Sequence, residues 1–198
     1  VARAVTESMV AVGLELARQL AERGDTVIAT ARDPETATDL NALGVRVEAL
    51  DLESPKSIAA FARRLKGAAV DVLFHNAAAG VAEPAVEEVS VEELVTHFRV
   101  DAIRPRLLTQ PLLPNLRAGE RRLVVAMSSG LGSIAENTSG GWVAYRVSKA
   151  ALHQLMKTLS AELESAGIST RPQPRFVLRS MGMACAWIKA DCPFSVVS

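Results

Sequence analysis

The feature that most constrains the fold is an alternation of short apolar runs with amphipathic helical patterns. Residues 26–31 (TVIATA) form a nearly continuous apolar run, which is typical of a strand buried on both faces. Before this run, residues 10–23 carry apolar side chains at three- and four-residue spacing with polar ones opposite, which predicts a helix. Strand and helix patterns in this repeated order predict parallel strands with helical crossovers, and therefore an α/β fold.

The remaining elements follow the same alternation. Strands are expected at residues 1–6, 26–31, 45–50, 70–74 and 121–127, and helices at 10–23, about 34–42, 55–65, 91–116 and 143–166. Pro105, Pro111 and Pro114 are expected to kink or divide the 91–116 helix, because proline lacks an amide donor. The segment after Ile168 fits a sixth strand followed by an irregular loop. No repeat or linker divides the chain, so we expect a single domain over residues 1–198.

Charge and composition exclude several classes of function. Lys and Arg number 22, as do Asp and Glu, so no global basic field exists to hold nucleic acid or an anionic membrane. The sequence has neither a long apolar run nor a signal-peptide pattern, so we expect a cytoplasmic protein without a membrane partner. Cys185 and Cys192 are expected to be thiols. His75, His97 and His153 lack metal-ligand spacing, so a metal site is not expected.

Tyr145 and Lys149 form the strongest local signal for chemistry. Four residues are about one helical turn, so the phenol and the ammonium should project from the same face. A nearby cation favours the phenolate and is expected to lower the pKa of Tyr145, which could then exchange a proton with a carbonyl or alcohol oxygen. The alternative is a half-buried tyrosine with an unrelated lysine.

Two serines follow the strand expected at 121–127. The carboxyl ends of parallel strands are where ligands bind, so the hydroxyl of Ser128 or Ser129 could donate to the same substrate oxygen. The alternative is that these serines only end the strand.

The segments S-S-G-L-G-S (128–133) and Y-R-V-S-K-A-A-L (145–152) resemble the active-site segments of the short-chain dehydrogenase/reductase family. The likeness runs from residue 1 to about 177, and longer phrases such as LARQLAERGDTVIATARDP are most similar to carbonyl-reductase-like and C-factor-like members. The resemblance implies a Rossmann-type doubly wound parallel sheet in three α/β/α layers. It also implies hydride transfer between a nicotinamide and a small-molecule carbonyl or secondary alcohol. It further implies homodimers or homotetramers formed through the 91–116 and 143–166 helices, and a domain lacking the usual C-terminal end.

The resemblance assigns roles to particular residues. Tyr145 would be the general acid/base, Lys149 would lower its pKa and hold the nicotinamide ribose, and Ser129, which is favoured over Ser128, would orient the substrate oxygen. Asp101 stands where an asparagine usually supports a proton-relay water, and it could pair with Lys149 if the two are close. The implied cofactor-binding residues are Thr6, Ser8, Val12, Gly13, Arg32, Asp51, Leu52, Asn76, Ala77, Ala78, Tyr145, Lys149 and Pro174.

Two of these positions have further consequences. Arg32 stands where an NAD-specific member usually has an acidic residue, and a guanidinium suits a 2′-phosphate, so NADP(H) is favoured over NAD(H). The Asp51 carboxylate could accept a hydrogen bond from the adenine amino group. Its alternative role is to cap the helix at 55–65, for which Ser54 is at least as suitable.

The sequence departs from the family pattern mainly at glycines. The phosphate loop T-G-x-x-x-G-x-G is degraded here to T-E-S-M-V-A-V-G, so that Glu7 and Ala11 replace glycines and a carboxylate lies beside the diphosphate position. Ala78 and Arg175 also replace expected glycines. Three interpretations remain: an active enzyme with a shifted loop, a non-catalytic binding or scaffold protein with impaired cofactor binding, or a sequence with uncertain residues. A Tyr/Lys pair could also serve an isomerase or epimerase.

Overall fold

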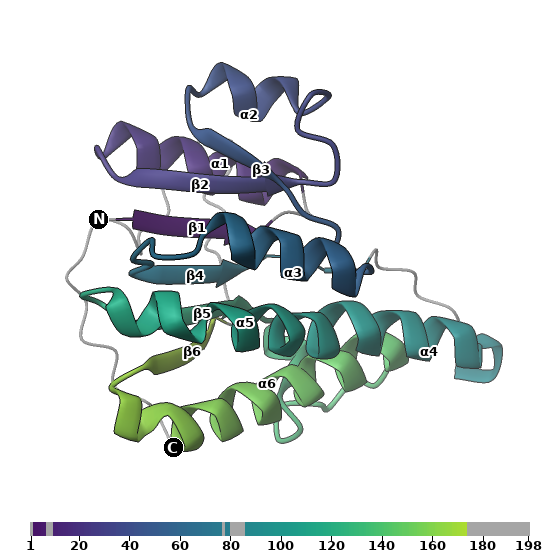
Figure 1. Cartoon of the computed structure of the whole chain (residues 1–198). Coiled ribbons are helices and arrows are strands. Elements are labelled where there is room, and N and C mark those ends of the chain that lie inside the picture. Colours follow the sequence, from purple (N-terminus) through teal and green to yellow (C-terminus); the bar gives the residue numbers. More distant parts are fainter. Residues whose placement is uncertain (1, 7–9, 77, 80–85, 174–198) are drawn as a thin grey trace.

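A six-stranded parallel sheet forms the centre of the computed structural model, which describes residues 2–6, 10–76, 78–79 and 86–173 (Figure 1). The strands are β1 (Ala2–Thr6), β2 (Thr26–Ala31), β3 (Arg46–Ala49), β4 (Val72–His75), β5 (Leu123–Met127) and β6 (Ser169–Gln173). Their order is β3-β2-β1-β4-β5-β6, and each neighbouring pair is parallel. This is the doubly wound arrangement predicted from the sequence. The strand expected after Ile168 is β6, which forms one edge of the sheet.

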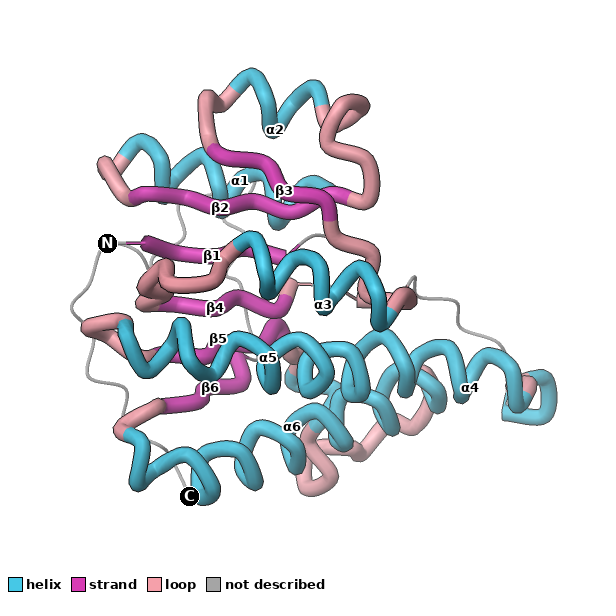
Figure 2. The backbone as a smooth tube through the Cα atoms, in the orientation of Figure 1, coloured by secondary structure: helices cyan, strands magenta, loops and turns pink. Residues whose placement is uncertain are grey.

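Helices cover both faces of the sheet (Figures 1 and 2). The α-helices are α1 (Val10–Glu22), α2 (Thr38–Ala42), α3 (Pro55–Arg64), α4 (Val91–Phe98), α5 (Arg104–Ala118) and α6 (Val143–Leu163). Helices α1 and α2 lie on one face, and α3, α5 and α6 lie on the other, while α4 packs beside α6 and extends beyond the sheet. Shorter helical turns are η1 (Val86–Glu88), η2 (Arg99–Ile103), η3 (Gly130–Gly132) and η4 (Glu164–Ala166).

Alternate strand residues divide the buried core between the two faces. Val27 and Phe74 belong to the cluster under α1 and α2, whereas Ile28 and Leu73 belong to the cluster under α3, α5 and α6. Successive side chains of a strand point to opposite faces, so a strand covered on both sides must be apolar at every position. This explains the continuous apolar runs in the sequence.

The long helical segment contains a π-helical turn that the sequence did not predict. Helix α4 ends at Phe98, η2 is π-helical, and α5 begins at Arg104 with Pro105 in its first turn, where no intrahelical donor is needed. The expected segment is thus divided just before Pro105, whereas Pro111 and Pro114 lie inside α5 and do not interrupt it. The packing of α5's buried leucines against the sheet offsets the cost of the two missing hydrogen bonds.

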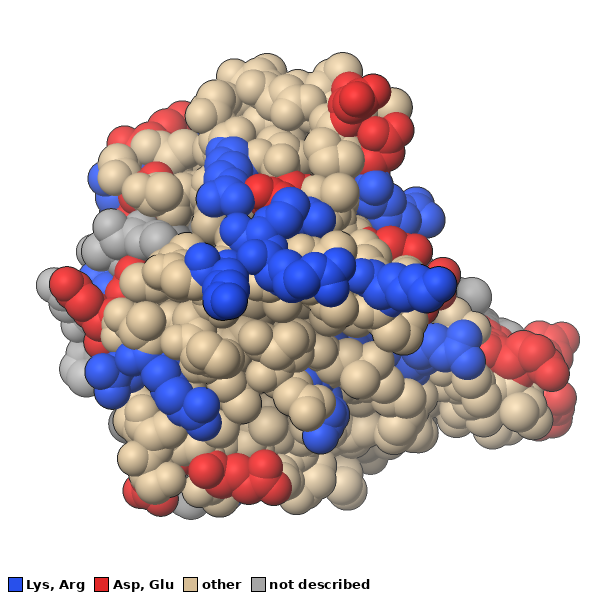
Figure 3. All heavy atoms as spheres, in the orientation of Figure 1, with Lys and Arg blue, Asp and Glu red and all other residues tan. Residues whose placement is uncertain are grey.

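Charge is segregated on the surface although the net charge is zero. Figure 3 shows Lys and Arg side chains gathered across the face that carries α3, and acidic side chains at the projecting end of α4. Lys56, Arg63, Arg64 and Lys66, in and just after α3, are all exposed. Among the described residues, no helix is long and apolar enough to cross a bilayer.

Candidate active site

Three residues predicted from the sequence meet at the carboxyl end of the sheet. Tyr145 and Lys149 come from the first turns of α6, and Asp101 comes from the π-helical turn. The Lys149 Nζ lies 3.4 Å from Asp101 Oδ1, and it donates a hydrogen bond of 3.2 Å to the carbonyl oxygen of Met127 at the end of β5. It also lies 5.4 Å from the centre of the Tyr145 ring. The pairing of Asp101 with Lys149, which the sequence left conditional on their distance, is therefore present.

The Asp101 carboxylate is held by donors from several elements. Ser148 Oγ donates to Oδ2 at 2.6 Å, and the backbone amide of Ala79 donates to Oδ1 at 3.2 Å. The Nδ1 of His97, one turn earlier, lies 4.0 Å from Oδ2. The side chains of Asp101 and Lys149 are 0% and 1% exposed, so this ion pair is shielded from water and has fixed hydrogen-bond partners.

Two aromatic rings frame Tyr145. His97 meets the phenol edge to face at 6.2 Å between ring centres, and the indole of Trp142 lies at 6.3 Å. Trp142 has a positive φ of 54°, directly after Gly140 and Gly141, whose φ values are also positive. A left-handed backbone costs a bulky residue about 1–2 kcal/mol, so local strain accompanies the placement of this indole.

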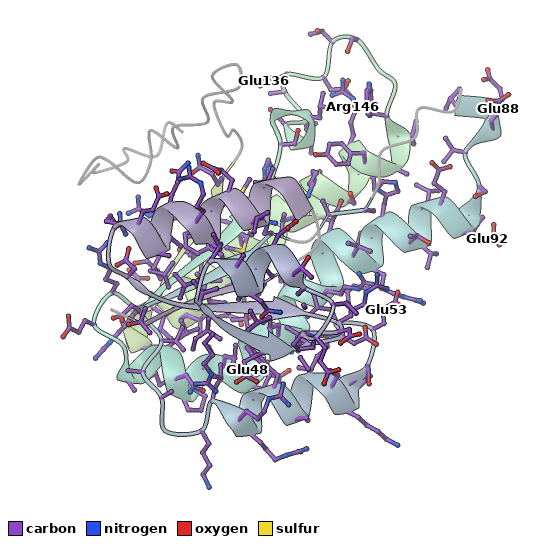
Figure 4. All side chains as sticks on the ribbon, turned by 90° about the horizontal axis from the view of Figure 1, so that it is seen from above. Glu48, Glu53, Glu88, Glu92, Glu136 and Arg146 are labelled. Carbon is purple, nitrogen blue, oxygen red and sulfur yellow. The ribbon has the colours of Figure 1, made fainter. Side chains whose placement is uncertain are left out.

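The loop that leads into α6 is tied to the helix. Arg146 points from the first turn of α6 toward this loop (Figure 4), and it donates to the Gly141 carbonyl at 3.0 Å and to Ser139 Oγ at 3.1 Å. These bonds connect the first turn of the helix to the loop that precedes it.

The protonation balance of the site differs from the sequence prediction. Burial raises the pKa of Tyr145, a hydrogen bond with Ser129 lowers it, and the charge of Asp101 raises it again. Burial lowers the pKa of Lys149, opposed by Asp101. The sequence analysis expected Lys149 to lower the pKa of Tyr145, and this direction is corrected: burial disfavours the phenolate, and the Asp101 carboxylate, which pairs with Lys149, raises the pKa further.

The two serines after β5 have separate partners. Ser128 Oγ lies 2.5 Å from Nε2 of His153, and His153 also hydrogen-bonds the backbone of Gly132. Ser129 caps the η3 turn by accepting from the Leu131 amide at 3.2 Å, and its hydroxyl is the one that reaches Tyr145. The choice of Ser129 over Ser128 as the serine that orients the substrate stays a prediction.

Gly132 and His153 are site residues that the sequence analysis missed. A β-carbon on Gly132 would lie 2.9 Å from the Lys149 Cβ and from the His153 ring, so only glycine allows the η3 turn to approach α6 this closely. The available signal was the glycine itself within S-S-G-L-G-S, but no spacing connects it to α6.

The residues expected to bind cofactor lie after the ends of neighbouring strands. Arg32 directly follows β2 and is exposed, and Asp51 and Leu52 follow β3. The Asp51 carboxylate accepts from the Glu53 amide at 2.9 Å, whereas Ser54 caps α3, so the capping role considered for Asp51 belongs to Ser54. Leu52 packs against the core.

The first turns of α1 approach the end of β4. Asn76 is buried after β4, and a β-carbon on Gly13 would lie 2.8 Å from its Nδ2, so a larger residue there would displace the Asn76 amide. Val12 precedes it in the same helix, and Ala78 follows two residues after Asn76, both half-buried. Ser8, Ala77 and Pro174 lie outside the described residues, as do Glu7 and Arg175, and Thr6 is described only as the end of β1.

The donor set fits a nicotinamide dinucleotide. Along the carboxyl edge of the sheet stand an exposed guanidinium (Arg32), a carboxylate (Asp51), an amide (Asn76) and an ammonium (Lys149), and Gly13 is the one residue in the first turn of α1 without a β-carbon. Ligands of doubly wound sheets bind at this edge, where the strand order reverses between β1 and β4. In the described part of the chain, no group of three or more His, Cys, Asp or Glu could hold a metal ion.

Comparison with known proteins gives consistent matches. The family model described as short chain dehydrogenase matches residues 4–172. The C-signal protein of Myxococcus xanthus is 36% identical over 124 residues, which are 62% of this chain and 75% of that protein. The 1-hydroxy-2-glutathionyl-2-methyl-3-butene dehydrogenase of Rhodococcus sp. strain AD45 is 30% identical over 181 residues, covering 90% of this chain and 75% of that enzyme.

Solved structures show the same likeness. A protein from Burkholderia multivorans described as a short-chain dehydrogenase/reductase with bound NADP superposes with a TM-score of 0.75 at 33% identity, covering 85% of this chain and 76% of that one. An NADPH-bound carbonyl reductase from chicken fatty liver gives 0.77 at 26% identity, covering 86% and 77%.

Proposed function

Because the chain belongs to the short-chain dehydrogenase family, we propose that it is an NADP(H)-dependent oxidoreductase of a carbonyl or secondary alcohol, placed in the cytoplasm. The observation that carries this proposal is the convergence of the Tyr145 phenol with the Ser129 hydroxyl and the Lys149 ammonium at the carboxyl end of β5. A phenol beside a hydroxyl suits the two contacts that a carbonyl oxygen needs during reduction.

Each residue has a distinct role in the proposed reaction. A bound reduced nicotinamide supplies the hydride that adds to the carbonyl carbon. Tyr145 donates its proton to the carbonyl oxygen, and Ser129 orients that oxygen by a second hydrogen bond. Lys149 would hold the nicotinamide ribose, and Asp101 fixes the position of Lys149. Arg32, Asp51 and Asn76 would bind the remainder of the cofactor.

Replacement of Tyr145 by Phe tests the catalytic assignment. The substitution removes only the phenol oxygen, so the fold and the NADPH affinity should stay close to those of the wild type. Loss of the general acid should lower kcat by about 10²–10⁴-fold. Turnover is followed by NADPH absorbance against a panel of small aldehydes and ketones, and cofactor binding by fluorescence. A Phe variant that reduces a substrate at the wild-type rate would remove Tyr145 from the mechanism.

We propose NADP(H) rather than NAD(H) because Arg32 is exposed directly after β2, where a 2′-phosphate could reach its guanidinium. The Burkholderia and chicken structures, which hold NADP and NADPH, support the same preference.

We also propose a homodimer or homotetramer assembled through the surface of α4 and α5. Val91, Val95, Phe98, Ile103 and Leu107 form an apolar stripe on this surface, with exposures between 38% and 69%. Contiguous exposed apolar residues of this kind mark interaction sites. Val147, 48% exposed on the neighbouring α6, extends the apolar surface. Sedimentation equilibrium gives the molar mass that tests this assembly.

A non-catalytic member of the family is the second candidate, because Glu7 and Ala11 replace phosphate-loop glycines. A carboxylate beside a diphosphate repels it, and a β-carbon narrows the approach of the backbone. Titration of the protein with NADPH and NADH distinguishes the two proposed functions. If neither cofactor binds at millimolar concentration, the non-catalytic function is favoured.

A further inference from the structure

A groove lies between α3 and α5, at the end of the sheet opposite the candidate active site. The two helices are neighbours on the same face (Figure 1), and the groove follows their carboxyl-terminal halves with a cavity volume of about 310 Å³. One of its walls continues into the turn that precedes β4, and the other ends at Ala118, before β5. The groove therefore lies toward the amino ends of the strands, whereas the candidate active site lies at their carboxyl ends.

Most of the groove lining is apolar and short. Ala62 and Ala68 lie on the α3 side, and Pro111, Pro114 and Ala118 lie on the α5 side. Pro114 and Ala118 are exposed, and the other three are half-buried. Because none of these side chains is long enough to fill the space between the helices, an apolar surface stays accessible from solvent.

Hydrogen bonds from Asn115 hold the two walls of the groove together. The side-chain amide of Asn115, which is buried in α5, donates to the carbonyl oxygens of Leu65 at 2.5 Å and Ala68 at 2.8 Å. The backbone amide of Val70 in turn donates to the Asn115 carbonyl at 3.0 Å. The groove is thus already formed, and a ligand would not have to supply the free energy to open it.

The charged side chains that line the described groove are both cations. Arg63 and Lys66 are exposed, and within the described part of the chain neither side chain has an ion-pair or hydrogen-bond partner. The adjacent Arg64 differs, because its guanidinium is paired with Glu48 at 2.5 Å. Two positive charges beside the apolar lining are therefore available to an anion.

The end of α3 does not occupy these cations. Basic side chains often bind the free carbonyl groups at the end of a helix. Here the carbonyl oxygens of Phe61, Arg63 and Leu65 already accept backbone amides at 2.9–3.1 Å. The helix dipole still favours positive charge at this position, but the donors of both side chains remain available for a ligand.

We propose that this groove binds a small amphipathic anion, namely an aliphatic chain that ends in a carboxylate. The chain would lie along the alanines and prolines, and the carboxylate would accept from the Arg63 guanidinium and the Lys66 ammonium. The cavity volume is at the lower end of the range of about 300–1,000 Å³ that is typical of small-molecule sites. Figure 3 shows that basic side chains gather on this face, which favours the approach of an anion. The site is separate from the proposed oxidoreductase site, so either proposal can fail without the other.

Amide NMR of the isotope-labelled full chain, titrated with octanoate, tests both the binding and its location. The signals of Gly67 and Ala68 should shift and saturate, while those of Gly140 and Gly141, in the loop before α6, should not move. Octanoate should bind about threefold or more tightly than hexanoate, because two more methylene groups leave water. The uncharged 1-hexanol should bind more weakly than hexanoate, because it cannot pair with the two cations.

Substitutions test the charged half of the site. Arg63→Gln and Lys66→Gln should each weaken octanoate binding by about two- to fivefold, the value of an exposed ion pair. Lys56→Gln is the matched control, since Lys56 is also an exposed cation of α3 but lies in its first turn, away from the groove lining. This control should bind octanoate with the wild-type affinity.

Several results would overturn the proposal. Absence of saturable shifts at millimolar octanoate, or shifts confined to Gly140 and Gly141, would show that the groove is not the site. Binding of 1-hexanol as tight as that of hexanoate would refute the role of the cations, as would an equal loss in Lys56→Gln and Arg63→Gln. The measurements on the wild type need no variant, so the proposal can be refuted even if a substituted chain fails to fold.

Discussion

Replacement of Gly132 by Ala should damage the site through a single methyl group. The new β-carbon would lie 2.9 Å from the Cβ and the carbonyl carbon of Lys149 and from Cε1 of His153. Ordinary carbon contacts are about 3.5–4.0 Å, so the η3 turn or α6 must move by roughly 1 Å. Two of the three atoms belong to the rigid part of Lys149 and cannot rotate away. Overpacking of this kind costs about 1–3 kcal/mol of unfolding free energy.

Gly130→Ala provides the matched comparison within the same turn. A β-carbon there would have no heavy atom within 4 Å, so this variant should stay within about 0.5 kcal/mol of the wild type. Urea unfolding of the two variants gives the difference, since both make the same change in the unfolded chain. Because a shift of about 1 Å at a catalytic group can cost roughly 10²-fold in rate, kcat/KM should fall in Gly132→Ala only. Equal stability of the two variants would refute the argument from close contact.

Two further predictions concern cofactor choice and pH. Arg32→Ala should weaken NADPH binding about tenfold or more, the value of one charge-assisted hydrogen bond, and leave NADH binding unchanged; equal weakening of both in fluorescence titrations would contradict a 2′-phosphate contact. Burial lowers the pKa of His75 to about 3, and the ring contacts Thr109 Oγ at 2.8 Å, so below pH 6.5 the unfolded chain binds a proton that the folded chain does not. The contribution of His75 to the free energy of unfolding should therefore be complete above pH 6.5 and fall by about 1.4 kcal/mol per pH unit between pH 6.5 and 3. Urea unfolding measured against pH should show this slope in the wild type and lose it in His75→Gln.

The sheet could be predicted because its signals are local. An apolar run such as residues 26–31 and the helix before it each carry their own periodicity, and parallel crossovers follow from their order. The pairing of Tyr145 with Lys149 could also be predicted from the sequence, because both residues lie on one helix at a spacing that places them on the same face.

Contacts between distant segments could not be predicted in the same way. Asp101 and Ser148 are 47 residues apart, and Ser128 and His153 are 25 apart, so no period connects them. The pKa of Tyr145 shows the consequence. Sequence proximity identified the nearest cation, but burial and a carboxylate from another element determine the direction of the shift.

The π-helical turn at Arg99–Ile103 behaves as a one-residue insertion in an otherwise regular helix. In a regular helix, side chains four residues apart lie on one face. The extra residue makes this step five residues, from Phe98 to Ile103, and the apolar stripe of α4 thus continues onto α5. Deletion of one residue here would restore regular winding and shorten the step from Phe98 to Ile103 to four residues, so the exposed stripe would stay aligned. Asp101 lies inside the π-helical turn, so its buried position depends on that turn more than the stripe does.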